Sequence, residues 1–247
     1  MTLRPLLAYA PWQLREMSVK ALSPLLVFAL LVSLPLWAAA GTNAGTDGSD
    51  ASLQMMKLNL FQSMAGLCVL IGGLVVANGT ISTDRERQHV RFLFAHPVSP
   101  LAFYLQRYIV GTLAVSALFV IGPAVYSSAV IEVPVWGALQ AIVLSCLFYG
   151  ALTMLAGAVT AKDGALVIGV FLVGSVTQQL TAADTAPQLV RIIATIMPPV
   201  NDVGDHIRFL LGGRIGRDPM PLWGVGLWTA GMLGAAMALV RRGPMVR

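Results

Sequence analysis

Residues 133–161 read VPVWGALQAIVLSCLFYGALTMLAGAVTA and contain no charged side chain. An α-helix needs roughly 20 apolar residues to cross the hydrocarbon core of a bilayer, so this run is long enough to span a membrane. Five more stretches without Asp, Glu, Lys or Arg lie on either side of it, at 21–46, 58–83, 108–131, 164–183 and 219–240. The pattern predicts six transmembrane helices, at about 22–40, 58–78, 104–130, 134–160, 164–182 and 220–240.

The composition also indicates a membrane protein. Of the 247 residues, 57% are hydrophobic and 11% are charged, and the mean hydropathy is +0.77. Soluble domains carry about 25% charged residues. The longest segment outside the uncharged stretches, 184–218, is too short for a separate soluble domain. We therefore expect one all-α, polytopic membrane domain over residues 1–247.

The positions of the basic residues predict the orientation of the chain. If the N-terminus is cytoplasmic, eleven of the 16 Lys and Arg residues lie on the cytoplasmic side and five lie outside. The positive-inside rule favours this arrangement, which places both termini in the cytoplasm. Topology thus accounts for the net charge of +5, and no nucleic-acid partner is expected.

Several kinds of chemistry are not indicated. The chain has neither G-x-x-x-x-G-K-[ST] nor G-x-G-x-x-G, so we expect no ATP site, no cofactor and no enzyme activity in this chain. Cys68 and Cys146 lie inside predicted spans, where they are expected to be small buried residues. No metal site is expected. No predicted span carries a buried ion pair or carboxylate of the kind that proton-coupled carriers and ion pumps place at mid-membrane, so any energy for transport should come from a partner.

Two further helix features are expected at the ends of the chain. Residues 5–20 mix apolar side chains with Trp12, Arg15, Glu16 and Lys20, which is typical of a helix lying in the cytoplasmic membrane interface. The last span carries a stripe of small residues at a spacing of four, namely Gly226, Ala230, Gly234 and Ala238. Such a stripe lets another helix approach closely.

The largest cytoplasmic segment, 79–107, predicts a short helix that begins at residue 84. Thr83 and Glu86 have capping-box spacing, and Asp84 in the first turn favours the same helix start. Arg87 and Arg91 would lie on a different side from the apolar residues, and Pro97 would end the helix. The alternative is a basic loop that only fixes topology.

This segment resembles the permeases of type 2 ABC exporters, the ABC-2 class, whose pattern is roughly E-x-E-x-G-T-L, an apolar run, Pro, Ser-Arg and later Lys. The matching positions are Asp84 and Glu86 at the acidic pair, Phe92-Leu93-Phe94 at the apolar run, Pro97 and Ser99 at the turn, and Arg107 at the basic position. The chain departs from the pattern at Gln88 and His89, which replace Gly-Thr, and at Pro100, which replaces the arginine.

The resemblance implies a function and a set of partners. The chain would be a six-span exporter permease of the cell inner (cytoplasmic) membrane. A route with apolar walls, as the spans would form, favours a hydrophobic or amphipathic cargo. A separate ABC ATPase, which binds ATP and Mg, would dock on a cytoplasmic coupling helix at Asp84, Glu86, Arg87 and Arg91. Two permease chains, identical or homologous, would form a dimer with a central path.

An outside amphipathic helix is expected before the last span. Asn201 follows Met197-Pro198-Pro199 and is a good N-cap residue. Five apolar residues then fall on one helical face, namely Val200, Val203, Ile207, Leu210 and Leu211. Gly212-Gly213 should end the helix. We expect it to lie on the outer leaflet or dip into it, and the resemblance implies a place near the exit of the substrate path.

Two alternative functions remain open at this point. Asp202, Asp205 and His206 lie within about one turn of each other, as in the site of a membrane-embedded enzyme acting on lipid. The other alternative is a structural membrane subunit that does not transport.

Overall fold

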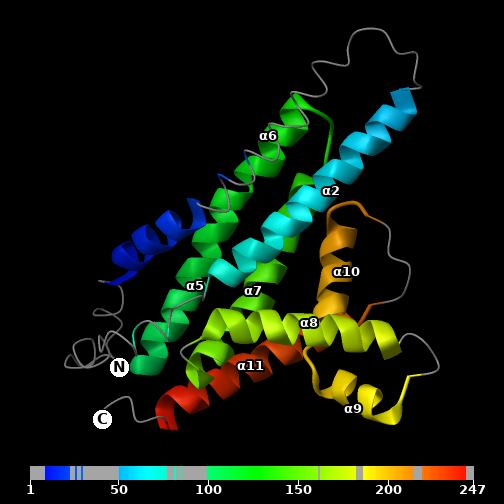
Figure 1. Cartoon of the computed structure of the whole chain (residues 1–247). Coiled ribbons are helices and arrows are strands. Elements are labelled where there is room, and N and C mark those ends of the chain that lie inside the picture. Colours follow the sequence, from blue (N-terminus) through cyan, green and yellow to red (C-terminus); the bar gives the residue numbers. More distant parts are fainter. Residues whose placement is uncertain are drawn as a thin grey trace.

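The computed structural model describes residues 9–22, 26, 29, 50–76, 81, 84, 99–160, 162–181, 186–213 and 219–242, and no strand occurs among them. Residues 9–22 are helical. The helices that follow are α2 (Asp50–Val75), α5 (Pro100–Phe119), α6 (Ile121–Ala129), α7 (Val135–Val159), α8 (Asp163–Thr181), α9 (Gln188–Ile196), α10 (Val200–Leu210) and α11 (Leu222–Arg242) (Figure 1). The all-α class is confirmed for this part of the chain.

Five helical segments of the described chain are long and apolar enough to cross a membrane, as expected for a polytopic membrane protein. They are Gln54–Val75, Pro100–Ala129, Val135–Val159, Asp163–Thr181 and Leu222–Arg241, which match the second to sixth predicted spans. The first predicted span, 22–40, lies almost wholly outside the described residues, so the count of six stays a prediction. The third span is interrupted between α5 and α6, because Pro123 has no N–H to donate to the carbonyl of Phe119.

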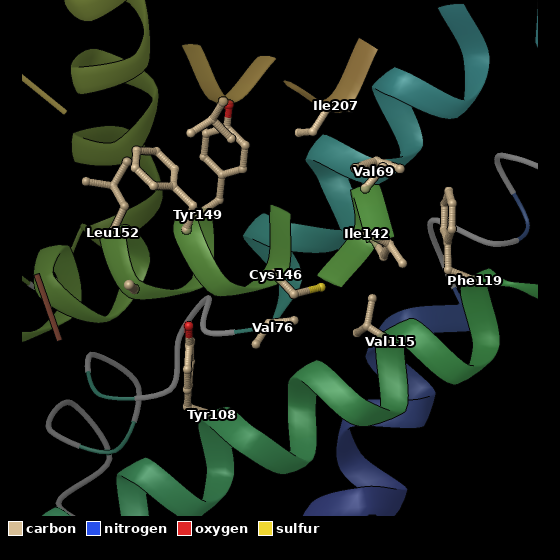
Figure 2. Close-up of a cluster of buried hydrophobic side chains, with 14 of the residues drawn as sticks. Val69, Val76, Tyr108, Val115, Phe119, Ile142, Cys146, Tyr149, Leu152 and Ile207 are labelled. Carbon is tan, nitrogen blue, oxygen red and sulfur yellow. The ribbon is translucent and has the colours of Figure 1, made fainter. Parts of the chain in front are cut away.

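Helix α7 is the centre of the fold. It packs against α2, α5, α6, α8, α10 and α11. In Figure 2, Ile142, Cys146 and Tyr149 of α7 lie among side chains of the surrounding helices. Small residues permit the close approach of α2, since a Cβ at Gly73 would overlap Ser145. The Ser145 hydroxyl donates a hydrogen bond to the Val69 carbonyl at 2.7 Å, which satisfies a polar group inside the bundle.

Helix α11 packs on α7 through the face opposite the small-residue stripe. Met232, Ala236 and Val240 are buried, whereas the stripe from Gly226 to Ala238 is exposed. A Cβ at Gly226 or Gly234 would meet no atom within 4 Å. The stripe therefore mediates no close helix contact among the described residues.

A helix forms over 9–22, largely within the segment 5–20 for which an interfacial helix is predicted, and it packs into the bundle. Trp12 is exposed, while Gln13, Met17 and Ala21, at a spacing of four, are buried. The ring of Tyr9 packs edge-on against Phe103 of α5, with 5.8 Å between ring centroids. The helix is thus a part of the core as well as a surface element.

Candidate functional site

A buried ion-pair network joins three segments at the first half of α5. The Arg107 guanidinium donates to Glu16 Oε1 at 2.6 Å and to Asp84 Oδ2 at 3.2 Å. The side chains of Arg107 and Asp84 are 4% and 9% exposed, so both charges are largely removed from solvent. Lys20 Nζ lies 3.0 Å from the same oxygen, Glu16 Oε1, and the Arg107 Cζ lies 5.9 Å from the Trp12 ring centre. We call Glu16, Asp84 and Arg107 the ion-pair junction.

The junction adds a feature that the sequence did not indicate. Arg107 lies near the start of Pro100–Ala129, a segment long and apolar enough to cross a membrane, so a buried ion pair occurs near the end of a candidate span and not at mid-membrane. The uncharged stretch of sequence begins only at Tyr108, one residue later, and nothing in the spacing indicates that Arg107 turns towards Glu16. A buried charge persists when it is paired and hydrogen-bonded, and two carboxylates meet that need here.

Of the predicted coupling residues, Asp84 is the one that the structure describes. It is helical, as expected for the first residue of the predicted helix, and it is buried in the junction. Thr83, Glu86, Arg87, Arg91 and Pro97 lie outside the described residues, so their predicted roles as cap, docking residues and stop remain predictions.

Helix α10 inserts beside α7 and runs antiparallel to it. The Tyr149 hydroxyl lies 3.5 Å from the Val200 carbonyl, and a Cβ at Gly137 would overlap the Leu210 carbonyl. The first residue of α10 is therefore level with the middle of α7, and its last residue is level with the start of α7. The predicted apolar face is confirmed, with Val203 and Ile207 buried. This face packs against α7 within the protein, rather than against the outer leaflet.

The start of α10 differs from the prediction, whereas its end agrees with it. The helix begins at Val200 after Pro199, so the N-cap prediction for Asn201 is wrong. Asn201 instead attaches α10 to α8, because its backbone N–H donates to Gln178 Oε1 at 3.1 Å and its side chain donates to the Ser175 carbonyl at 3.3 Å.

The predicted glycine stop has the geometry of a Schellman motif. Gly212 has φ of 84°, and Gly212 and Gly213 donate to the carbonyls of Phe209 and Arg208. The end of the helix at Gly212-Gly213 is therefore confirmed.

A groove with many polar side chains runs alongside α10 and is bordered by α2 and α8. It consists of two cavities of about 420 and 410 Å³ that share Leu70, Tyr149, Gly204 and Arg208. Its polar lining residues are Asn59, Gln62 and Ser63 of α2, Gln178 and Gln179 of α8, and Asn201, Asp205 and Arg208 of α10. We call this the α2–α10 groove. Amide and hydroxyl groups in membrane-spanning helices offer hydrogen bonds to polar parts of a ligand or to another helix.

The residues of the enzyme alternative make structural contacts. Asp202 Oδ1 accepts from the Met220 N–H at 3.3 Å, and His206 Nε2 lies 2.7 Å from the Met220 carbonyl, where it acts as the donor. Asp205 lies 3.7 Å from Arg208. Asp202 and His206 thus hold the segment before α11 against α10. Among the described residues, no group of three His, Cys, Asp or Glu side chains is placed to hold a metal ion.

Helix α9 is an element that the sequence interpretation missed. Its signal was present, because Leu189, Ile192 and Ile196 recur at helical spacing after Pro187.

Comparison with known proteins yields no match: no protein-family model, no curated protein and no solved structure is similar to this chain. The function is therefore argued from the residues and their arrangement.

Proposed function

We propose that this chain is the transmembrane permease subunit of an ABC transporter of the ABC-2 type, and that a separate ATPase subunit supplies the energy. The observation that carries the proposal is the ion-pair junction. Asp84, the first residue of the predicted coupling helix, is bound to Arg107 of α5, which in turn is bound to Glu16 of the N-terminal helix. A helix that receives a push from a partner needs a stiff attachment to the membrane bundle, and buried charge-assisted hydrogen bonds supply one.

In the proposed mechanism, closure of two ATPase subunits on ATP displaces the coupling helix of each permease. The displacement passes through Asp84 and Arg107 to α5, and α5 packs directly on α7. Since α7 also contacts α2, α8, α10 and α11, a tilt of α5 would move the bundle as a body. Two permease chains moving in this way would open and close a path between them.

The α2–α10 groove favours an amphipathic cargo over a purely hydrophobic one. Its lining combines apolar residues such as Leu70 and Phe171 with side-chain amides such as Gln178 and Gln179. A cargo with a polar head and an apolar body would satisfy both kinds of surface, because buried polar groups need hydrogen-bond partners.

Charge reversal on the predicted coupling helix tests the proposal. We expect the double variant Arg87→Glu/Arg91→Glu to insert normally, lose co-purification of the ATPase and lower ATP turnover in membranes. A double substitution is needed, because one exposed ion pair contributes only about 0 to 1 kcal/mol. The control is Arg241→Glu/Arg242→Glu at the end of α11, also predicted to be cytoplasmic, which should leave both readouts unchanged. Wild-type ATPase binding and turnover in the first double variant would overturn the coupling role.

A further inference from the structure

A third cavity, separate in position from the ion-pair junction, lies where four helices meet. Its volume is about 520 Å³, which is within the roughly 300 to 1,000 Å³ typical of small-molecule sites. It is bordered by the end of α8, by α9, by the start of α10 and by α11. The residues that matter for its chemistry are Gln178, Thr181, Arg191, Asp202, Met220 and Trp228.

The cavity lies at the ends of two helices that are long and apolar enough to cross a membrane. Thr181 is the last residue of α8, and Met220 comes two residues before α11 begins. If both helices cross a membrane, the ends that border the cavity lie at the edge of the hydrocarbon region. Trp223 and Trp228 in the first turns of α11 agree with this depth, because tryptophan is enriched at membrane interfaces.

The lining carries groups of opposite charge beside an aromatic ring. Arg191 supplies a guanidinium, which suits a phosphate through paired hydrogen bonds. Asp202 supplies a carboxylate and Trp228 an indole ring, and groups of these two kinds attract an ammonium group. A molecule with one phosphate and one ammonium group would match this arrangement.

The two sides of helix α9 differ in polarity. Arg191, Ala194 and Thr195 line the cavity. Leu189, Ile192 and Ile196 point away from the protein and are 68%, 53% and 70% exposed. A helix with one polar and one apolar side is suited to the membrane interface. Its exposed apolar side, next to the cavity, gives acyl chains a surface to pack against.

We propose that this cavity binds the headgroup of a zwitterionic phospholipid, in the leaflet that the predicted topology places outside. Arg191 binds the phosphate, Asp202 and Trp228 bind the ammonium group, and the acyl chains pack against the apolar side of α9. The site serves lipid binding by this chain and does not depend on the proposed ATPase partner. A failure of ATPase binding would therefore leave this inference intact, and the reverse also holds.

Native mass spectrometry tests the proposal. The full chain is extracted from the membrane and purified in detergent for this measurement. The probes are phosphatidylethanolamine, which is zwitterionic, and phosphatidylglycerol, which has the phosphate without the ammonium group. We expect phosphatidylethanolamine to be retained about ten-fold better, the size of effect that one charge-assisted hydrogen bond provides. Equal retention of the two lipids by the wild-type chain would overturn the proposal without any variant.

Two substitutions and two matched controls locate the site. Arg191→Gln should weaken retention of both lipids. Asp202→Asn should weaken only phosphatidylethanolamine, and it preserves an oxygen that accepts from the Met220 N–H. Arg208→Gln and Asp205→Asn make the same chemical changes on α10 at residues that line the α2–α10 groove instead, so they should have no effect. Equal effects of the test and control variants would overturn the assignment to this cavity.

A competition experiment identifies the source of the headgroup. Soluble glycerophosphoethanolamine carries the same phosphate and ammonium groups without acyl chains. We expect millimolar amounts of it to leave bound phosphatidylethanolamine in place, because it cannot use the apolar side of α9. Displacement by the soluble compound would overturn the assignment to membrane lipid.

Discussion

Glu16 and Arg107 are joined by a hydrogen bond of 2.6 Å, although 91 positions separate them in the chain. This contact attaches the N-terminal helix to α5 beside Asp84. The N-terminal helix, the segment at Asp84 and α5 are therefore joined through the Arg107 guanidinium. A displacement of any one of them would distort the ion pairs to the others. The junction is the feature from which the proposed coupling to a partner follows.

Arg107→Leu should strongly destabilise the protein. The substitution deprives the buried Asp84 carboxylate of its cation and removes one of two cationic partners of the half-buried Glu16. Breaking a buried pair in this way costs about 3 to 5 kcal/mol. Thermal unfolding of the protein in detergent measures the effect. Asp84→Asn in the same background should recover part of the loss. Arg241→Leu is the control, because Arg241 is exposed at the end of α11. Equal melting temperatures of Arg107→Leu and this control would contradict the prediction.

Gly137→Ala should loosen the attachment of α10 to α7. A Cβ at this position would overlap the Leu210 carbonyl, which belongs to the backbone and moves only with the helix. Overpacking of this kind costs about 1 to 3 kcal/mol. Gly204→Ala is the matched control on α10, because a Cβ there meets nothing within 4 Å. The control should be neutral or stabilising by about 0.5 to 1 kcal/mol, since alanine favours a helix more than glycine does. Similar melting temperatures of the two variants would show that α10 tolerates a shift.

Gly212→Ala should weaken the end of α10 by about 1 to 2 kcal/mol, because its φ of 84° is unfavourable for a residue with a Cβ. Hydrogen exchange at the Gly213 amide, which donates to the Arg208 carbonyl, should become faster. Gly226→Ala, at an open position on α11, serves as the reference. Unchanged exchange at Gly213 would mean that the turn does not depend on glycine.

His206→Ala should be mild for transport and cost about 1 kcal/mol of stability, the usual contribution of one hydrogen bond, which here goes to the Met220 carbonyl. Asp205→Ala should cost about 0 to 1 kcal/mol, because its partner Arg208 is exposed. Transport and thermal stability are the readouts. A complete loss of activity in either variant, with assembly intact, would favour the lipid-active enzyme alternative.

Labelling with a membrane-impermeant thiol reagent tests the predicted topology. Asp50→Cys should react in intact cells, and Lys162→Cys should react only after the cells are opened. The native thiols give little background, because Cys68 and Cys146 are fully buried. Reaction at position 162 in intact cells would reverse the predicted orientation.

The sequence by itself determined the long apolar helices and the outline of α10. Helices long and apolar enough to cross a membrane occur where spans are predicted at 58–78 and 134–160, because the thickness of a bilayer imposes a length on an uncharged apolar run, and that length is a local property. The end of α10 at Gly212 is local for the same reason, since a positive φ favours glycine. The apolar side of helix α9 is local information too, because Leu189, Ile192 and Ile196 recur at helical spacing.

The tertiary structure alone decided what each face contacts. Val203 and Ile207 would suit lipid as well as protein, because both surroundings are apolar, and only the fold places them against α7. The pairing of Arg107 with Glu16, and of Asp202 and His206 with Met220, joins positions far apart in sequence. Sequence spacing carries no information about such contacts. They form because a charge or polar group that the fold buries must find a partner wherever the packing brings one.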